Sequence, residues 1–180
     1  MIETPQAVLD FWRGAGPKKW FSKDAAFDDA IRARFLATHE AAAADELAGW
    51  ETTPDSALAL VIALDQFPRN VFRGNARMFA ADPLARQVAD RAIARGFDQQ
   101  VPARERGFFY LPFMHSERLE DQERSVALYQ ALGEVENLKY ADDHADIIRK
   151  FGRFPHRNAM LGRTTTAEEQ AFLDRGGFAG

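Results

Sequence analysis

The chain contains no cysteine, which excludes disulfides, thiolate metal ligands and cysteine nucleophiles. Long hydrophobic runs are also missing, since the longest, residues 57–64, is less than half the length of a membrane-spanning helix. The first residues show neither the basic region nor the apolar stretch of a signal peptide. We therefore expect a cytoplasmic protein that does not associate with membranes.

Basic stripes and strong catalytic motifs are absent too. The net charge is −4 with both signs interleaved, so nucleic acid is not expected as a partner. The sequence has no phosphate-binding loop, dinucleotide fingerprint, nucleophile elbow or His-Glu-x-x-His helix, and we predict neither a cofactor nor a metal site. A metal site drawn from His115, Glu117, His144 or His156 is the less favoured alternative.

What is present indicates a folded, all-α protein. The 180 residues are 46% hydrophobic and 28% charged, which is typical of a globular chain and predicts a single domain over residues 1–180. Apolar residues recur at helical spacing, and the alternation typical of strands is missing. Helix starts are predicted at Thr4, Ser22, Thr53 and Thr166 from their capping hydroxyls.

Several boundaries follow from local signals. The run LALVIAL at residues 58–64 is apolar on every side and predicts a central, buried helix, followed by a loop at residues 67–75. Pro112 should interrupt an aromatic-rich helix, because proline lacks an amide donor. Asn137 is the predicted cap between helices at about 120–136 and 138–152.

Asp65 is the first candidate site residue. It lies on the apolar face of the central helix, in its last turn, where the helix dipole disfavours an anion. An arginine such as Arg69 or Arg153, or a protonated histidine, should therefore compensate its charge. Asp65 is either half of a structural ion pair or an acid that orients a functional histidine.

Two histidines share this ambiguity. His144 lies on the inward face marked by Ile147, Ile148 and Phe151, and His115 follows the Pro112 helix with Glu117 close behind it. Each is either a satisfied core residue or a group aimed into a pocket.

Two Phe-Pro segments gather cationic and amide side chains after buried helices. The later one contains Arg153, His156, Arg157, Asn158 and Arg163, and the earlier one contains Arg69 and Asn70. Guanidinium groups in such clusters bind carboxylates or phosphates in pairs of hydrogen bonds. They also cap helix ends and pair with acids, and the sequence leaves both readings open.

The segments LDQFPRNVFRG (residues 64–74), RGFFYLPFMHSE (106–117) and FGRFPHRNAMLGRTTTAEEQAFL (151–173), with VLDFW at residues 8–12, resemble the family called domain of unknown function 924. The resemblance implies antiparallel helix pairs stacked as a compact, tetratricopeptide-like right-handed superhelix, and it implies no activity. The motif positions are Asp65, Gln66, Arg69, Asn70, His115, Ser116, Glu117, His144, Arg153, His156, Arg157, Asn158 and Arg163.

Three functions fit these features. The first is a binding protein whose Arg69, Asn70, Arg153, His156, Arg157, Asn158 and Arg163 hold a small anionic molecule or peptide terminus. The second is a hydrolase-like enzyme with His144 or His115 as catalytic base and Asp65 or Glu117 orienting it. The third is a purely structural polar network in an interaction scaffold. The sequence leaves catalysis, ligand identity and homo-oligomer formation open.

Overall fold

The computed structural model describes residues 1–178, which form helices and no strand and thereby confirm the all-α prediction. Contacts between Cα atoms divide the chain into two compact units, Met1–Pro112 and Phe113–Gly180. The expectation of one domain over residues 1–180 stays a prediction, as does the tetratricopeptide-like superhelix. Within the described residues, no helix is both long enough and apolar enough to cross a membrane.

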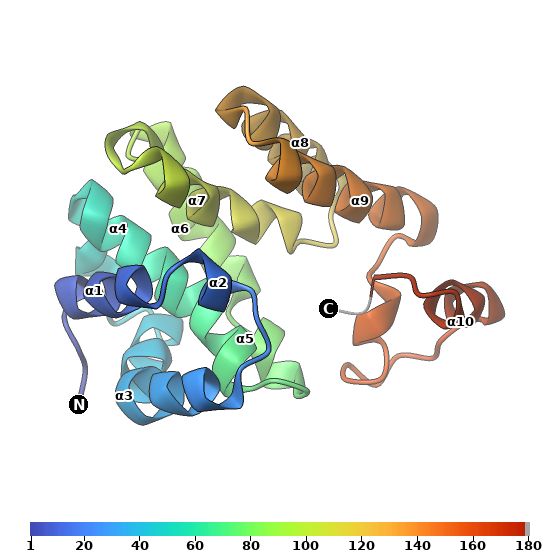
Figure 1. Ribbon diagram of the computed structural model, residues 1–180, viewed down its shortest axis with the longest axis horizontal. Helices are drawn as coiled ribbons and strands as arrows, with labels where there is room; N and C mark the ends of the chain where they lie inside the picture. The colour runs from blue at the N-terminus through green and yellow to red at the C-terminus, as the bar shows by residue number, and fades with distance from the viewer. Residues whose placement is uncertain (179–180) are drawn as a thin grey trace. The chain divides into compact units, whose positions relative to one another are not determined.

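The first unit consists of long helices joined by short helical segments (Figure 1). Its elements are α1 (Pro5–Ala15), α2 (Pro17–Trp20), α3 (Ala25–Ala43), η1 (Ala48–Thr52), α4 (Pro54–Val61), η2 (Ile62–Gln66), α5 (Phe67–Val71), η3 (Ala76–Phe79), α6 (Asp82–Ala94), η4 (Asp98–Gln100) and the part of α7 (Ala103–Met114) up to residue 112. The segment η2 is a π-helix, and the other η segments of this unit are 3-10 helices.

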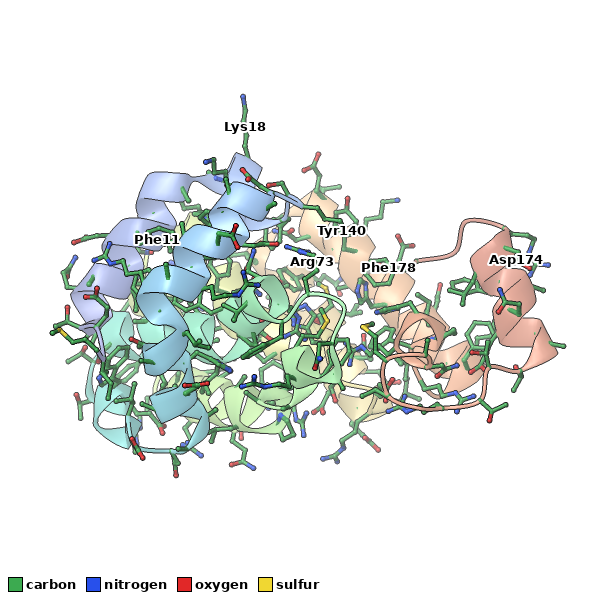
Figure 2. All side chains as sticks on the ribbon, turned by 90° about the horizontal axis from the view of Figure 1, so that it is seen from below. Phe11, Lys18, Arg73, Tyr140, Asp174 and Phe178 are labelled. Carbon is green, nitrogen blue, oxygen red and sulfur yellow. The ribbon has the colours of Figure 1, made fainter. Side chains whose placement is uncertain are left out.

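Helix α4 forms the centre of this unit, as its apolar sequence predicts. It packs against α1 and α6, and all of residues 57–64 are buried. An aromatic cluster closes one side: the rings of Trp12 and Trp20 stack at 6.1 Å, and Phe108 meets both edge-on. Lys18, between the two tryptophans in the chain, instead points away from the ribbon (Figure 2).

The central helix changes register at η2, just before the predicted loop. The amide of Phe67 donates to the carbonyl of Ile62, five residues back, which is the π-helical pattern. Residues 67–71 then continue as α5, so the loop predicted for residues 67–75 is wrong for its first five positions. Pro68 sits in the first turn of α5, where its missing amide donor is tolerated.

Three predicted helix starts in this unit have definite outcomes. The caps at Thr4 and Thr53 are confirmed, since each side chain accepts a hydrogen bond from the first turn of its helix. The cap predicted at Ser22 is wrong, because Asp24 accepts from the amide of Phe27 instead. Both residues are good caps, and the one nearer the first apolar position is used.

The second unit begins within α7 and contains α8 (Leu119–Leu132), α9 (Val135–Phe151), η5 (Pro155–Arg157) and α10 (Ala167–Asp174). Helices α8 and α9 pack side by side as a hairpin (Figure 1), and Gly133 ends α8 with φ 78°. The cap predicted at Asn137 is wrong: Asn137 lies inside α9 and donates to Glu134, which occupies the cap position. The capping box of Thr166 with Glu169 is confirmed.

Pro112 does not interrupt its helix, so that prediction is wrong as well. Helix α7 runs through it from Ala103 to Met114. A proline inside a helix costs about 3 kcal/mol. Burial of neighbouring large side chains offsets this cost, since Phe109, Tyr110 and Phe113 are all buried.

Candidate functional site

Asp65 lies on the π-helix η2 and is completely buried, with its charge compensated inside the first unit. Its carboxylate is 3.3 Å from the guanidinium of Arg69, and Gln66 donates to it at 2.6 Å. Arg69 also donates twice to the carboxylate of Asp82, at 2.9 and 3.0 Å. Burial alone would lower the pKa of Arg69, but the two carboxylates hold that pKa above its usual value. The expected arginine partner of Asp65 is therefore confirmed as Arg69.

Asn70 belongs to a neighbouring ion pair. Its amide donates to Asp28 at 2.7 Å, and Arg73 holds the same carboxylate with two hydrogen bonds. Arg69 and Asn70, predicted to bind a ligand, are thus both engaged with carboxylates of the first unit.

In the second unit, Glu117 holds the later Phe-Pro segment. It accepts two hydrogen bonds from Arg163, at 2.9 and 2.8 Å, and one from the backbone amide of Phe154. Burial raises the pKa of Glu117, but Arg163 and this amide outweigh it and leave the pKa below its usual value. Glu117 is therefore an ionised anchor for the segment that follows α9.

Glu169 anchors the same segment from α10. It accepts two hydrogen bonds from Arg153, at 2.6 and 2.8 Å, and one from Asn158 at 3.2 Å. The hydrogen bonds from Arg153 and from the amide of Thr166 outweigh burial, which raises the pKa of Glu169, and they lower this pKa to about 2. The capping-box pattern identified Glu169 as part of a helix start. It did not show that Glu169 also binds Arg153 and Asn158, two of the predicted ligand-binding residues.

Arg157 is buried, and its guanidinium lies over the ring of Phe154 at 4.5 Å. It donates to the backbone carbonyl of His115 at 2.9 Å, so the observed contact of His115 with the arginine uses the main chain. His156 packs its ring against Phe154 and Phe178. The predicted anion-binding groups of this segment therefore have protein acceptors or aromatic neighbours in the second unit.

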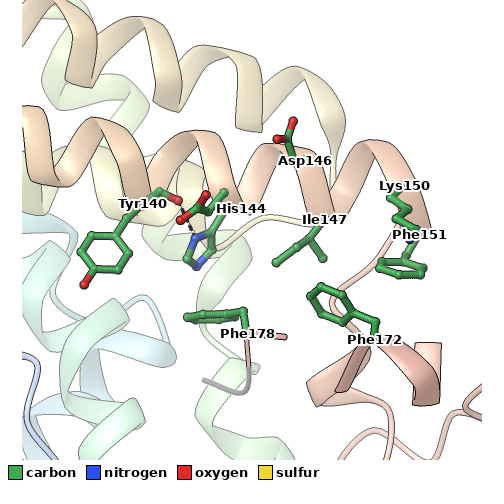
Figure 3. A pocket seen from close by; sticks show the side chains of 9 residues that line it. Tyr140, His144, Asp146, Ile147, Lys150, Phe151, Phe172 and Phe178 are labelled. Carbon is green, nitrogen blue, oxygen red and sulfur yellow. Dashed lines mark hydrogen bonds between the residues drawn. The ribbon is translucent and has the colours of Figure 1, made fainter. Parts of the chain in front are cut away.

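His144, on α9, has a different environment and lies in the wall of a pocket. The prediction that it faces inward is confirmed, since only 6% of it is exposed. Its Nδ1 is 2.7 Å from the carbonyl of Tyr140, which can only accept, so Nδ1 carries the proton (Figure 3). Burial, together with the nearby charge of His115, lowers the pKa of His144 to about 4. At neutral pH its Nε2 is therefore a hydrogen-bond acceptor, and within residues 1–178 nothing donates to it.

The pocket beside His144 has a volume of about 450 Å³. Its apolar lining comes from α9, α10 and the segment after α10, namely Tyr140, Ile147, Phe151, Phe172 and Phe178. The rings of His144 and Phe178 are 4.4 Å apart, and both point into the pocket (Figure 3). Tyr140 and Phe178 are also the most exposed of the apolar lining residues. The sequence indicated His144, but no signal identified Tyr140 or Phe178 as its neighbours.

Charged side chains at the pocket are predominantly acidic. Asp143 and Asp146 line it together with a single cation, Lys150. Lys150 is 3.3 Å from Glu168, which compensates part of its charge. The ion pairs of the two aspartates, with Lys139 and Arg149, are exposed and therefore weak. The lining side chains therefore carry more negative than positive charge, while the nearby charges of His115 and Arg157 disfavour a further positive charge at His144 itself.

The contacts of His144 give less support to the hydrolase-like enzyme than to a binding protein. In the described part of the chain, His144 makes no hydrogen bond to a carboxylate, and Glu117 accepts from Arg163 and the Phe154 amide. No three histidine or acidic side chains within residues 1–178 gather closely enough to hold a metal ion.

Comparison with known proteins identifies the family. Residues 8–177 match the family described as "Bacterial protein of unknown function (DUF924)". The chain belongs to this family. A solved structure, that of the protein of unknown function ATU0120 from Agrobacterium tumefaciens, is similar at 53% identity over 96% of this chain and 97% of that one, with a TM-score of 0.93. No curated protein matches the chain.

Proposed function

We propose that this member of the family is a binding protein, and that the pocket beside His144 takes an apolar ligand that carries a hydrogen-bond donor. The observation that carries the proposal is the unengaged Nε2 of a buried, neutral histidine in the wall of an aromatic pocket. Sites for small molecules combine such apolar walls with a few oriented polar groups.

The ligand's charge follows from the pocket. Two aspartates and one partly compensated lysine line it, so an apolar amine fits this site better than the anionic ligand expected from the arginines. An ammonium group donates to Nε2 of His144 while its apolar body contacts Ile147 and Phe178. A peptide amino terminus with an apolar first residue has the same chemistry.

The clustered arginines of the second unit have a structural role. Arg153 and Arg163 are held by Glu169 and Glu117, and a ligand anion would have to displace these carboxylates. The structural network considered for these residues therefore describes them better than an anion-binding function does.

The test uses two probes that differ only in their charged end, phenethylamine and 3-phenylpropionate, titrated into ¹⁵N-labelled protein at pH 7. We expect phenethylamine to bind with a dissociation constant on the order of 1 mM, as is typical of a small fragment. Its amide shifts should fall on residues 140–151 and 172–178, and 3-phenylpropionate should bind more weakly.

The matched variants are His144→Phe and Asp142→Ala. The first keeps an aromatic ring beside Phe154 and Phe178 but removes Nε2, and the second changes an exposed residue of α9 outside the pocket lining. His144→Phe should weaken phenethylamine binding about fivefold, the value of one hydrogen bond, and Asp142→Ala should leave it unchanged. Equal binding to His144→Phe and wild type, or no shift at 10 mM amine, would overturn the proposal.

A further inference from the structure

The first unit contains a second pocket, around another histidine that the sequence motifs did not indicate. It has a volume of about 400 Å³ and lies among α3, the residues after it, the end of α5, η3 and the start of α6. Its lining residues are His39, Glu40, Ala43, Ala44, Phe72, Arg77, Ala80, Ala81 and Leu84.

His39 is held in one tautomer by the π-helix. In the register of η2, the carbonyl of Ala63 would accept from residue 68, but Pro68 has no amide hydrogen. The α-helical partner, the amide of Phe67, already donates to Ile62. Nδ1 of His39 lies 2.9 Å from the Ala63 carbonyl and donates to it. The irregular turn therefore determines which nitrogen of His39 carries the proton.

This leaves Nε2 of His39 as an acceptor at the wall of the pocket. His39 is 5% exposed, and burial lowers its pKa, so the ring is neutral at pH 7. Among the described residues, this imidazole contacts the carbonyl of Ala63 at Nδ1 and the ring of Phe72 edge-on at 5.6 Å. Nothing within residues 1–178 donates to Nε2.

Arg77 supplies the pocket's cationic group. Its guanidinium lies over the ring of Phe72 at 3.9 Å, which fixes its plane and leaves its edge for hydrogen bonds. One nitrogen is 3.4 Å from Glu40, and both side chains are more than half exposed, so this ion pair is weak. A ligand carboxylate that makes two hydrogen bonds to a guanidinium can compete with such a contact.

The two charges lie on an otherwise apolar surface. Beside the two charges, the pocket is lined by His39, Phe72, four alanines and Leu84. We infer that this pocket binds a small zwitterion with an apolar body, the chemistry of a free apolar amino acid. Its carboxylate pairs with Arg77, and its ammonium group donates to Glu40 and to Nε2 of His39.

The test compares L-phenylalanine with its two halves, 3-phenylpropionate and phenethylamine, which each lack one charge. In titrations of ¹⁵N-labelled protein at pH 7, L-phenylalanine should shift amides at residues 39–44 and 72–84. Each half should bind there at least about fivefold more weakly, because one charged contact is lost. Shifts confined to residues 140–178, or equal affinity for 3-phenylpropionate, would overturn the inference.

Arg77→Gln is the decisive variant, and Arg34→Gln is its matched control. Both arginines lie over a phenylalanine and pair with a glutamate, but Arg34 contacts Phe35 and Glu3 outside the pocket. Arg77→Gln should weaken L-phenylalanine binding at least about tenfold, and Arg34→Gln should not change it. Equal effects of the two substitutions would count against the site. His144→Phe should leave binding in the first unit intact, so failure of one proposal is distinguishable from failure of the other.

Discussion

The two units each contain a buried, neutral histidine in a pocket wall, but the two histidines differ in what they do for the fold. His39 donates to the carbonyl of Ala63, which the π-helix and Pro68 leave without an amide partner. His144 donates to the carbonyl of Tyr140, which lies four residues back in a regular helix and has a backbone partner as well. The first histidine completes the backbone hydrogen bonding, and the second adds to bonding that is already complete.

The network of Asp65, Arg69 and Asp82 in the first unit is more buried than the pair of Glu117 and Arg163 in the second. The carboxylate of Asp65 is 1% exposed and that of Asp82 10%, whereas Glu117 is 22% exposed and Arg163 32%. A charge that is removed from water depends more strongly on its partner. Removal of the arginine should therefore cost more stability in the Asp65–Arg69–Asp82 network than in the Glu117–Arg163 pair.

Arg69→Met is expected to have the largest effect on stability and tests the difference between the two networks most directly. It leaves Asp65 and Asp82 buried without their cation and should lower the free energy of unfolding by about 3–5 kcal/mol. Arg163→Met, the counterpart in the more exposed pair with Glu117, should cost about 1 kcal/mol. Urea denaturation at pH 7 measures both, and equal losses would contradict the difference between the networks.

The next effect concerns the pH dependence that His144 causes. Its pKa is about 4 in the folded protein and 6.5 when unperturbed, so the unfolded state binds the extra proton between these values. Above pH 6.5 the free energy of unfolding should contain the full contribution of the neutral His144. As the pH drops to 4, this free energy should fall by up to about 3 kcal/mol. His144→Phe should remove this part of the loss. Denaturation curves at pH 6.5, 5 and 4 test it, and parallel losses in variant and wild type would refute it.

The smallest effect compares the two histidines directly. His39→Phe leaves the buried Ala63 carbonyl without a donor and should cost about 1–3 kcal/mol at pH 7. His144→Phe keeps the helical partner of the Tyr140 carbonyl and should cost less than about 1 kcal/mol. Denaturation midpoints and slopes of the two variants sharpen the comparison. A larger loss for His144→Phe would reverse our assignment of the structural histidine.

Local features were predictable where one turn of helix decides them. The caps at Thr4, Thr53 and Thr166 involve partners three residues away, and Asp65 meets Arg69 four residues on. The inward face of His144 followed from helical spacing alone. The caps at Ser22 and Asn137 were wrong because neighbouring Asp24 and Glu134 occupy the cap positions instead.

The partners of the candidate site residues were less predictable, because they are distant in the chain. Glu117 meets Arg163 across 46 positions, and His39 meets Ala63 across 24. Nothing in the sequence near His39 indicates that the carbonyl of Ala63 lacks an amide donor. That donor is missing only because η2 adopts the π-helical register before Pro68.

The sequence by itself determined the all-helical class, most helix starts and the inward face of His144, because periodicity and capping act within a few residues. Only the tertiary structure decided which arginines are held by carboxylates and which histidine nitrogen remains unengaged. Burial and long-range pairing set these properties, since a charge or lone pair is free or occupied according to what the fold places beside it.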